Sequence, residues 1–230
     1  MGDAAFVRTM FTRIAARYDL MNSLMTAGRH HAWRAAVARA AVAAPPGPIL
    51  DLATGTADLA LAIRLLDPRR AVIGADFAEG MLHAARAKLG RRRETGIPLV
   101  AADALSLPFP ASAFACVASA FLLRNLEDLA RGLAEMRRVT RPGGRLVALD
   151  IVRPAPAAWA ALFGLYFHRI VPAVGALVAG DRQAYTYLPR SVDQFVTPGE
   201  LAALVERAGW RAVSYRTLGL GTIALHSAIA

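Results

Sequence analysis

Apolar residues along this chain gather in short uninterrupted runs that lack the polar alternation of a half-exposed strand. Five such runs lie within residues 49–53, 71–75, 99–101, 114–121 and 145–152. Strands of a parallel sheet lose this alternation because helices cover both faces of the sheet. Between the runs, apolar residues recur at helical spacing, as they do in 79–93. The pattern therefore predicts an α/β fold built on a parallel sheet.

Near the C-terminus the pattern predicts one more helix and two further strands. Thr197-Pro198-Gly199-Glu200 has the residues of a helix start, with Thr at the N-cap, Pro at the first helical position and Glu at the third. Two further strands are expected at Arg211–Thr217 and Leu220–His226, joined only by Leu218-Gly219. So short a link suits an antiparallel hairpin, because a parallel pair needs a long crossover. We expect seven strands, the last of them antiparallel.

Two segments fall outside this alternation of strands and helices. Residues 1–44 carry apolar side chains at helical spacing, interrupted at Asp19 and Asn22, and predict a helical arm before the first strand. Residues 154–190 are apolar and aromatic and predict a helical insertion after strand five. We expect a single domain over residues 1–230. An arm that caps a ligand cleft and an arm that only packs are both compatible with the pattern.

The stretch Ile49–Asp76 indicates the ligand. The first strand carries Asp51, Gly55 lies in the turn that follows, and Asp76 ends the second strand. Open α/β sheets bind ligands beyond the carboxyl ends of their strands, where an acid about 20 residues after the glycine turn binds ribose hydroxyls. The three glycines of a dinucleotide-binding turn and the Gly-Lys-Ser/Thr of a phosphate loop are missing. A nucleoside without phosphate fits better, and S-adenosylmethionine (SAM) is one.

Composition bears on partners and compartment. The formal net charge is +10 and comes from arginine, because Lys88 is the only lysine. Nucleic acid, an anionic membrane surface and a simple compositional bias are all compatible with this charge. A single cysteine, Cys116, fits a reducing compartment, and the longest apolar stretch, Ala157–Phe167, is too short to span a bilayer. We expect a cytoplasmic protein without a metal, since no Cys/His cluster has zinc spacing.

Several motifs make the chain resemble a known family. The acid-ended first two strands and Arg141-Pro142-Gly143-Gly144 before the fifth resemble class I SAM-dependent methyltransferases, whose Rossmann-like sheet has seven strands and an antiparallel last strand. Beyond that core, the chain resembles the UbiE/MenG/Coq5 family of quinone C-methyltransferases over nearly its whole length. The motifs that carry this resemblance are Phe11-x6-Tyr18-Asp19-x-Met21-Asn22, Gly28-x-His30-x2-Trp33, Leu123-Arg124-Asn125, His168-x3-Pro172-x2-Gly175, Asp181-x3-Tyr185-x-Tyr187-Leu188-x2-Ser191 and Ala224-Leu225-His226.

The resemblance implies a reaction and a set of site residues. Family members methylate demethylmenaquinol and 2-methoxy-6-polyprenyl-1,4-benzoquinol with SAM, so we expect C-methylation of a prenylated quinol drawn from a membrane. The cofactor-binding residues that it implies are Asp51, Gly55, Thr56, Asp76, Asp103, Ala104 and Ala120. The catalytic residues are Tyr18, Arg124 and Asn125, and the substrate-binding residues are His168 and Tyr185. Arginine stays charged, so we expect Arg124 to stabilise a phenolate or to polarise a water that takes the hydroxyl proton.

Two positions depart from the family pattern and keep other functions open. Ala120 stands where relatives carry a serine that contacts SAM, and Leu122 stands where the family usually has glycine. A non-catalytic SAM-binding protein and a small-molecule C- or O-methyltransferase of secondary metabolism therefore remain alternatives. Nucleic acid is not expected as the substrate, because residues 121–124 do not match Asn/Asp-Pro-Pro-Tyr/Phe and no proline precedes Cys116.

The apolar segment Trp159–Val178 is the candidate entrance for a polyprenyl tail. Its aromatic and aliphatic residues also suit a peripheral contact with a membrane. Ordinary core packing and a homodimer face are alternatives for the same segment.

Overall fold

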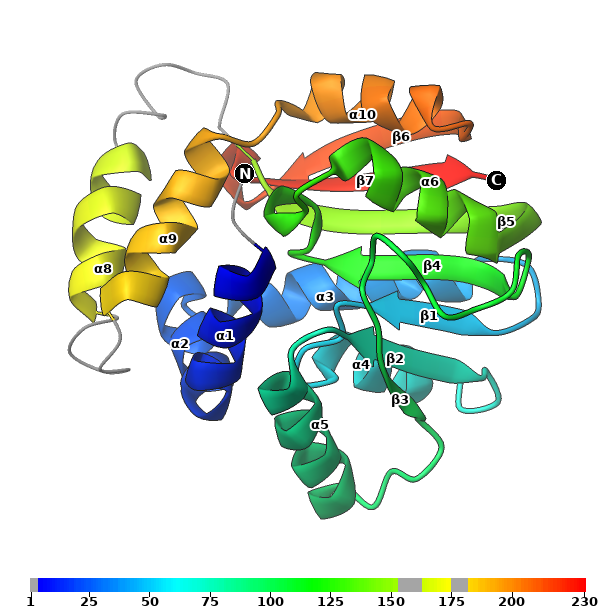
Figure 1. Cartoon of the computed structure of the whole chain (residues 1–230), viewed down its shortest axis with the longest axis horizontal. Helices are drawn as coiled ribbons and strands as arrows, with labels where there is room; N and C mark the ends of the chain where they lie inside the picture. The colour runs from blue at the N-terminus through cyan, green and yellow to red at the C-terminus, as the bar shows by residue number, and fades with distance from the viewer. Residues whose placement is uncertain (1–3, 153–162, 175–181) are drawn as a thin grey trace.

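The computed structural model describes residues 4–152, 163–174 and 182–230 (Figure 1). Seven strands form one sheet in the order β3-β2-β1-β4-β5-β7-β6. The strands are β1 (Ile49–Leu52), β2 (Val72–Asp76), β3 (Leu99–Ala101), β4 (Phe114–Ala120), β5 (Thr140–Ile151), β6 (Arg211–Leu218) and β7 (Ile223–Ile229). The first five pair in parallel, whereas β7 pairs antiparallel with both β5 and β6. The predicted α/β class, the seven strands and the antiparallel end are confirmed.

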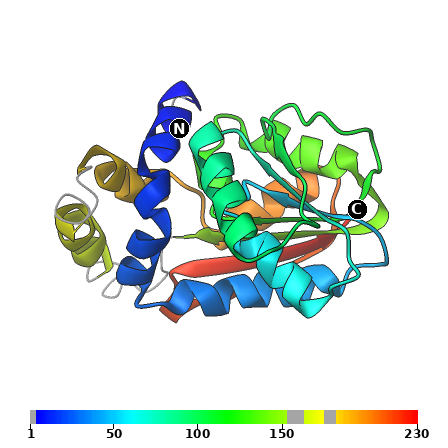
Figure 2. The ribbon, with the colours of Figure 1, turned by 90° about the horizontal axis from the view of Figure 1, so that it is seen from below.

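Helices cover both faces of this sheet, as the uninterrupted apolar runs require. The helices outside the insertion are α1 (Ala4–Ile14), η1 (Ala15–Arg17), α2 (Tyr18–Thr26), α3 (Arg29–Val42), α4 (Asp58–Leu66), α5 (Glu79–Arg91), η2 (Leu123–Asn125), α6 (Leu129–Val139) and α10 (Pro198–Arg207). Helices α3, α4 and α5 pack on one face and α6 and α10 on the other (Figure 2). Neighbouring strand residues divide between the two cores: Leu50 faces α6, and Ile49 faces α3.

The ends of some strands differ from the prediction. β5 already begins at Thr140, five residues before the apolar run that predicted it, and its pairing with β4 shifts register near this start. The link between β6 and β7 is a 3-10 turn, η5 (Gly219–Gly221), so β7 starts at Ile223. The link therefore covers residues 219–222 and is longer than the two residues expected; both of its glycines and Leu220 have positive φ angles.

The two added segments pack against each other beyond one end of the sheet. The arm predicted over residues 1–44 contains α1, η1, α2 and α3. Because α3 packs on the sheet, the term arm is used below for α1, η1 and α2 alone. Asp19 and Asn22 lie inside α2, so the expected interruption there was wrong. The insertion contains the π-helix η3 (Tyr166–Ile170), α8 (Val171–Val174) and α9 (Arg182–Asp193). Residues 153–162 and 175–181, which include both ends of Trp159–Val178, lie outside the described residues. A shared core joins arm and insertion through Met10, Met21, Phe167 and Tyr185.

Two further features follow from the described residues. The helix start predicted at Thr197 is confirmed as a full capping box, in which Thr197 and Glu200 each bind the other's backbone N–H. No helix among the described residues is both long and apolar enough to cross a membrane.

Candidate active site

The carboxyl ends of β1, β2 and β4 meet at one edge of the sheet and form a cleft of about 410 Å³. The turn after β1 brings Gly55 there with a φ of +55°. A side chain built on Gly55 would find Tyr18 as its nearest neighbour, 4.0 Å away, so the glycine backbone faces open space beneath the arm. Gly55, Asp76 and Ala120 all line this cleft, as expected for a cofactor site.

Asp76 provides the polar centre of this cleft. Its side chain accepts the backbone N–H of Gly55 at 2.8 Å and that of Ala78 at 2.9 Å. Burial raises the pKa of the Asp76 carboxyl, and these two hydrogen bonds oppose the rise. Each carboxylate oxygen keeps a further lone pair for an outside donor. Asp76 and the bare backbone of Gly55 therefore fit a ribose with two free hydroxyls.

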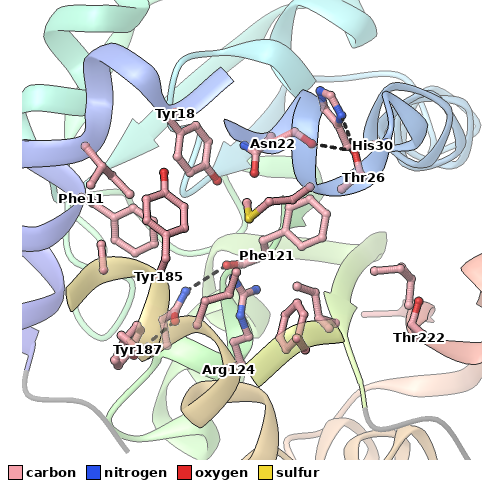
Figure 3. A pocket seen from close by; sticks show the side chains of 18 of the residues that line it. Phe11, Tyr18, Asn22, Thr26, His30, Phe121, Arg124, Tyr185, Tyr187 and Thr222 are labelled. Carbon is pink, nitrogen blue, oxygen red and sulfur yellow. Dashed lines mark hydrogen bonds between the residues drawn. The ribbon is translucent and has the colours of Figure 1, made fainter. Parts of the chain in front are cut away.

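A second, larger pocket of about 930 Å³, counting the open space at its mouth, adjoins the cleft. Its walls are mainly aromatic and aliphatic and come from the arm, the end of β4 and the insertion (Figure 3). The residues that line both cavities are Phe11, Tyr18, Phe121 and Asn125. The arm therefore forms a wall of both sites, which decides between the two alternatives for its role: it covers the cleft.

Arg124 is buried in the wall of the second pocket. Its guanidinium forms an ion pair with Asp150, whose carboxylate also accepts the backbone N–H of Arg124 at 3.2 Å and that of Ile151 at 2.8 Å. The side chains of Arg124 and Asp150 are 6% and 1% exposed. The guanidinium also lies 5.7 Å from the centre of the Phe121 ring. Asp150 therefore fixes the cation, whereas Asp128, the next acid along the chain after Glu127, caps helix α6.

Asn125 and two tyrosines complete the polar part of this wall. The amide of Asn125 donates to the carbonyl of Phe121 at 3.0 Å, and the Tyr187 hydroxyl donates to Asn125 Oδ1 at 3.3 Å. Tyr185 also lines the pocket and is 4% exposed. Burial raises the pKa of Tyr187, so its hydroxyl stays neutral. Tyr18, Arg124, Asn125 and Tyr185 thus meet around one cavity.

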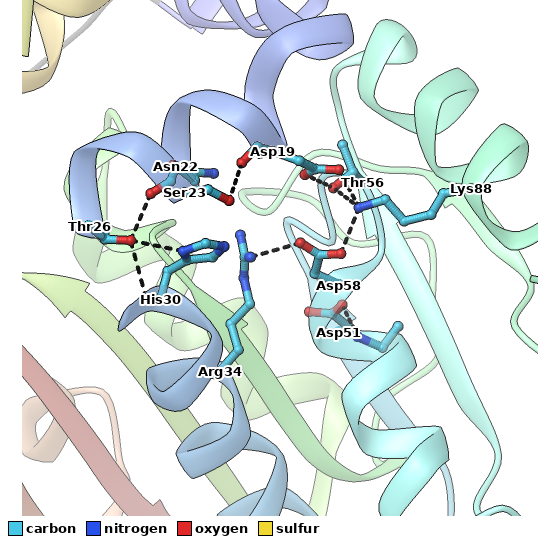
Figure 4. Close-up of polar contacts among 11 residues, drawn as sticks. Asp19, Asn22, Ser23, Thr26, His30, Arg34, Asp51, Thr56, Asp58 and Lys88 are labelled. Carbon is cyan, nitrogen blue, oxygen red and sulfur yellow. Dashed lines mark hydrogen bonds and ion pairs between the residues drawn. The ribbon is translucent and has the colours of Figure 1, made fainter. Parts of the chain in front are cut away.

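Thr56 belongs to a polar network that ties the arm to the domain (Figure 4). Its hydroxyl donates to Asp19 Oδ1 at 2.7 Å and accepts from Lys88 Nζ at 2.8 Å. Lys88 also pairs with Asp19 at 2.5 Å and with Asp58 at 2.6 Å. Thr56 lines neither cavity, because these bonds aim its hydroxyl at the arm.

Four other predicted site residues also lie outside the walls of both cavities. Asp51 is 1% exposed under the glycine turn, where it accepts from Thr54 Oγ1 at 2.6 Å and from the Ala60 N–H at 3.0 Å. Burial raises the pKa of Asp51 to about 7. Asp103 is exposed and accepts the N–H of Leu105, while Ala104 packs in the core. His168 pairs with Asp193 at 3.1 Å on the outside of the insertion.

Sequence reasoning missed several residues of the site. Asp150 is the last residue but one of β5, and Asp76 is the last of β2, so the same rule of an acid near a strand end could have found Asp150. Phe121 leaves β4 with a φ of +69°, which turns the chain from the strand into the 3-10 helix that carries Arg124. No sequence signal marks this turn, because left-handed geometry usually falls on glycine or asparagine.

Comparisons with known proteins agree with this site. The model of the ubiE/COQ5 methyltransferase family matches residues 1–230. The demethylmenaquinone methyltransferase of Deinococcus radiodurans is 44% identical, over 94% of this chain and 88% of the relative; that of Thermus thermophilus is also 44% identical, over 94% and 98%. The ubiquinone/menaquinone biosynthesis C-methyltransferase of Methylobacterium nodulans is 39% identical, over 96% and 89%.

Solved structures agree on the fold. A SAM-dependent methyltransferase of Thermotoga maritima superposes with a TM-score of 0.68 at 16% identity, over 96% of this chain and 98% of that one. Another from Aquifex aeolicus gives 0.59 at 17%, over 80% and 82%. The fold, the family match and the cleft around Asp76 agree, and the chain is a SAM-dependent methyltransferase that belongs to the ubiE/COQ5 methyltransferase family.

Proposed function

We propose that this enzyme methylates a ring carbon of a prenylated quinol, such as demethylmenaquinol or 2-methoxy-6-polyprenyl-1,4-benzoquinol. The observation that carries the proposal is the apolar pocket beside the cofactor cleft, with the buried cation of Arg124 in its wall. Apolar walls suit a fused or prenylated ring, and one buried cation suits a phenolate. Relatives named for demethylmenaquinone methylation favour the naphthoquinol of the two.

Asp76 and Gly55 would hold the nucleoside of SAM, with Ala120 at the end of β4 beside them. SAM supplies a methyl group made electrophilic by its sulfonium. Phe11, Tyr18 and Asn125, shared by the two cavities, line the place where cofactor and acceptor meet. Holding the acceptor carbon in line with the methyl is the main task of such a site, because alignment alone can lower a barrier by roughly 7–11 kcal/mol.

Arg124 would then make the ring carbon nucleophilic. A quinol carbon attacks readily once the neighbouring hydroxyl has lost its proton, and a buried guanidinium stabilises the resulting phenolate. Arginine keeps its proton and therefore cannot accept another, so the hydroxyl proton would leave through water next to Arg124. The ring carbon gains the methyl group and gives up its hydrogen as a proton, which restores the aromatic ring.

The exposed apolar residues of the arm and the insertion support a peripheral contact with a membrane, from which a prenylated acceptor would be drawn. Leu20 and Leu24 on α2 are 52% and 50% exposed, and Leu165 and Ile170 on the insertion are 59% and 50% exposed. The Tyr166 hydroxyl donates to the carbonyl of Met25 at 2.7 Å, so the two segments are joined next to these residues. This surface adjoins the acceptor pocket, which Met25 and Tyr166 both line.

The test is transfer of labelled methyl from SAM to a panel of reduced acceptors. We expect product from prenylated naphthoquinol or benzoquinol under reducing conditions, and none from transfer RNA. Loss of product when the acceptor is kept as the oxidised quinone would support the phenolate step. Transfer only to unrelated phenols would instead support an enzyme of secondary metabolism, and transfer to no acceptor would reject the proposal.

A further inference from the structure

The acceptor pocket has a second polar region that the proposed chemistry leaves unused. Arg124, Asn125 and Tyr187 form one region, and Asn22, Thr26 and His30 of the arm and α3 form the other. Figure 3 shows the Asn22 side chain near the Tyr18 hydroxyl, on the opposite side of the pocket from Arg124. The wall between the two regions is mainly aromatic and aliphatic.

Thr26 and His30 are largely occupied by each other. The Thr26 hydroxyl donates to the backbone carbonyl of Asn22 at 2.7 Å, and its oxygen lies 2.8 Å from His30 Nδ1. Burial and the nearby Arg34 cation lower the pKa of His30 to about 4, and the ring is neutral. Its Nε2 has no partner among the described residues, but Figure 4 shows the ring held between Thr26 and Arg34.

The Asn22 side chain is different. Its Nδ2 is buried and has no hydrogen-bond partner among the described residues. A buried donor without an acceptor costs roughly 1–3 kcal/mol. The helix does not explain the residue, because asparagine inside a helix such as α2 is a poor choice. Asn22 lines the pocket, so a molecule bound there can supply the missing hydrogen-bond acceptor.

We propose that Asn22 binds the second ring oxygen of the acceptor, opposite the oxygen served by Arg124. A 1,4-dihydroxy ring carries its two oxygens at opposite ends, and the pocket offers polar groups on two opposite sides. A carboxamide can donate to such an oxygen through Nδ2 and accept a hydroxyl proton through Oδ1. Asn22 is then a specificity residue that fixes which ring edge faces the methyl group. This inference rests on the proposed function.

The experiment pairs a variant with a matched acceptor. Asn22→Leu keeps the size of the side chain and removes both polar atoms, and Asn22→Ala is the second variant should the first not fold. The acceptors are a prenylated 1,4-dihydroxynaphthalene and the same compound without the second hydroxyl. We expect the variants to lower kcat/KM for the dihydroxy acceptor by roughly ten- to a hundredfold. The monohydroxy acceptor lacks the oxygen that Asn22 would bind. For this acceptor we therefore expect kcat/KM of wild type and variants to agree within about twofold.

The neighbouring Ser23→Ala is the matched control. Ser23 lies in the same helix, its hydroxyl donates to the carbonyl of Asp19, and it does not line the pocket, so we expect no change with either acceptor. Equal losses on both acceptors, or no loss on either, would overturn the role of Asn22. A wild-type enzyme that methylates neither acceptor would instead reject the proposed function itself. SAM affinity, measured by calorimetry, separates both outcomes from misfolding, because a variant that binds SAM like wild type is folded.

Discussion

Asp76 is the residue on which the cofactor site depends most. Replacing Asp76 by Ala removes a charge-assisted bond to the ribose, worth roughly 1.5–3 kcal/mol, and frees the N–H groups of Gly55 and Ala78. We expect the SAM dissociation constant to rise more than about tenfold in calorimetry. Unchanged affinity in a folded variant would place the nucleoside elsewhere.

Arg124 and Asp150 form one functional unit. We expect Arg124→Ala to lower kcat at least about a hundredfold, since it removes the stabilising cation, with SAM binding unchanged. Asp150→Asn should lower kcat by roughly tenfold because the guanidinium loses its buried partner.

The double variant tests this coupling. If Asp150 acts through Arg124, then Asp150→Asn should have little further effect once Arg124 is alanine. Multiplying losses in the double variant would mean that Asp150 acts independently, and near-normal kcat in Arg124→Ala would remove the arginine from the mechanism.

Asp51 should make stability depend on pH. Its pKa is raised to about 7 in the fold, from 3.8, so the folded state keeps a proton that the unfolded state has lost. The free energy of unfolding should therefore fall as pH rises from about 4 through 7, with the full loss above 7. Asp51→Asn cannot ionise and should remove this slope. Denaturant melts of both proteins at pH 5.5 and 8 measure the change in the free energy of unfolding between the two pH values. An equal change in wild type and Asp51→Asn would show that Asp51 is ionised throughout.

At the scale of residues, the sequence predicted which residues lie at strand ends and in glycine turns, but it did not predict the partners of side chains. Asp76, Gly55 and Arg124 sit at positions that the strand rule fixes. The direction of Thr56 depends on Asp19, which is 37 residues away in sequence, and no local pattern encodes that pairing. His168 was assigned by family motif alone, and its ion pair with Asp193 holds it on the outside of the insertion.

At the scale of elements, the capping box of α10 should carry measurable stability. Thr197→Ala removes the acceptor for the Glu200 N–H and should lower the free energy of unfolding by about 1 kcal/mol in urea melts. Thr197→Ser keeps the oxygen and is the matched control, expected within a few tenths of wild type. Equal losses in both variants would point to the lost methyl group instead of the cap.

Element types were easier to predict than element boundaries. Apolar runs found every parallel strand because burial on both faces favours apolar residues along the whole strand. The π-helical turn Tyr166–Ile170 had no such signal, since one additional residue in a helical turn changes neither composition nor polarity. Asp19 and Asn22 were misread as an interruption because their helix, α2, is polar where it meets the glycine turn and the pocket.

At the scale of the whole molecule, we expect the arm to move when the cofactor exchanges. Val7, Phe11 and Tyr18 of the arm line the cofactor cleft, and the Asp19–Lys88 pair holds the arm against α5. We expect Asp19→Asn to speed SAM dissociation several-fold in stopped-flow measurements and to raise amide exchange in the arm. High salt should act in the same direction on wild type, because the Asp19 side chain is 43% exposed.

Ser23→Ala is the control for the arm, because Ser23 lies on the same helix and bonds to the backbone carbonyl of Asp19, not to the carboxylate that pairs with Lys88. Dissociation rates that are equal in wild type and Asp19→Asn would mean that the cofactor leaves by another route, with the arm in place.

The single lysine gives this enzyme a built-in chemical reporter. Apart from the amino terminus, Lys88 is the one primary amine in the sequence, and its side chain is 13% exposed while Asp19, Asp58 and Thr56 surround it. An amine-selective reagent therefore has one internal target, protected for as long as the arm is closed. The rate of modification, followed by mass with and without bound cofactor, would measure how often the site opens in the unmodified wild-type chain.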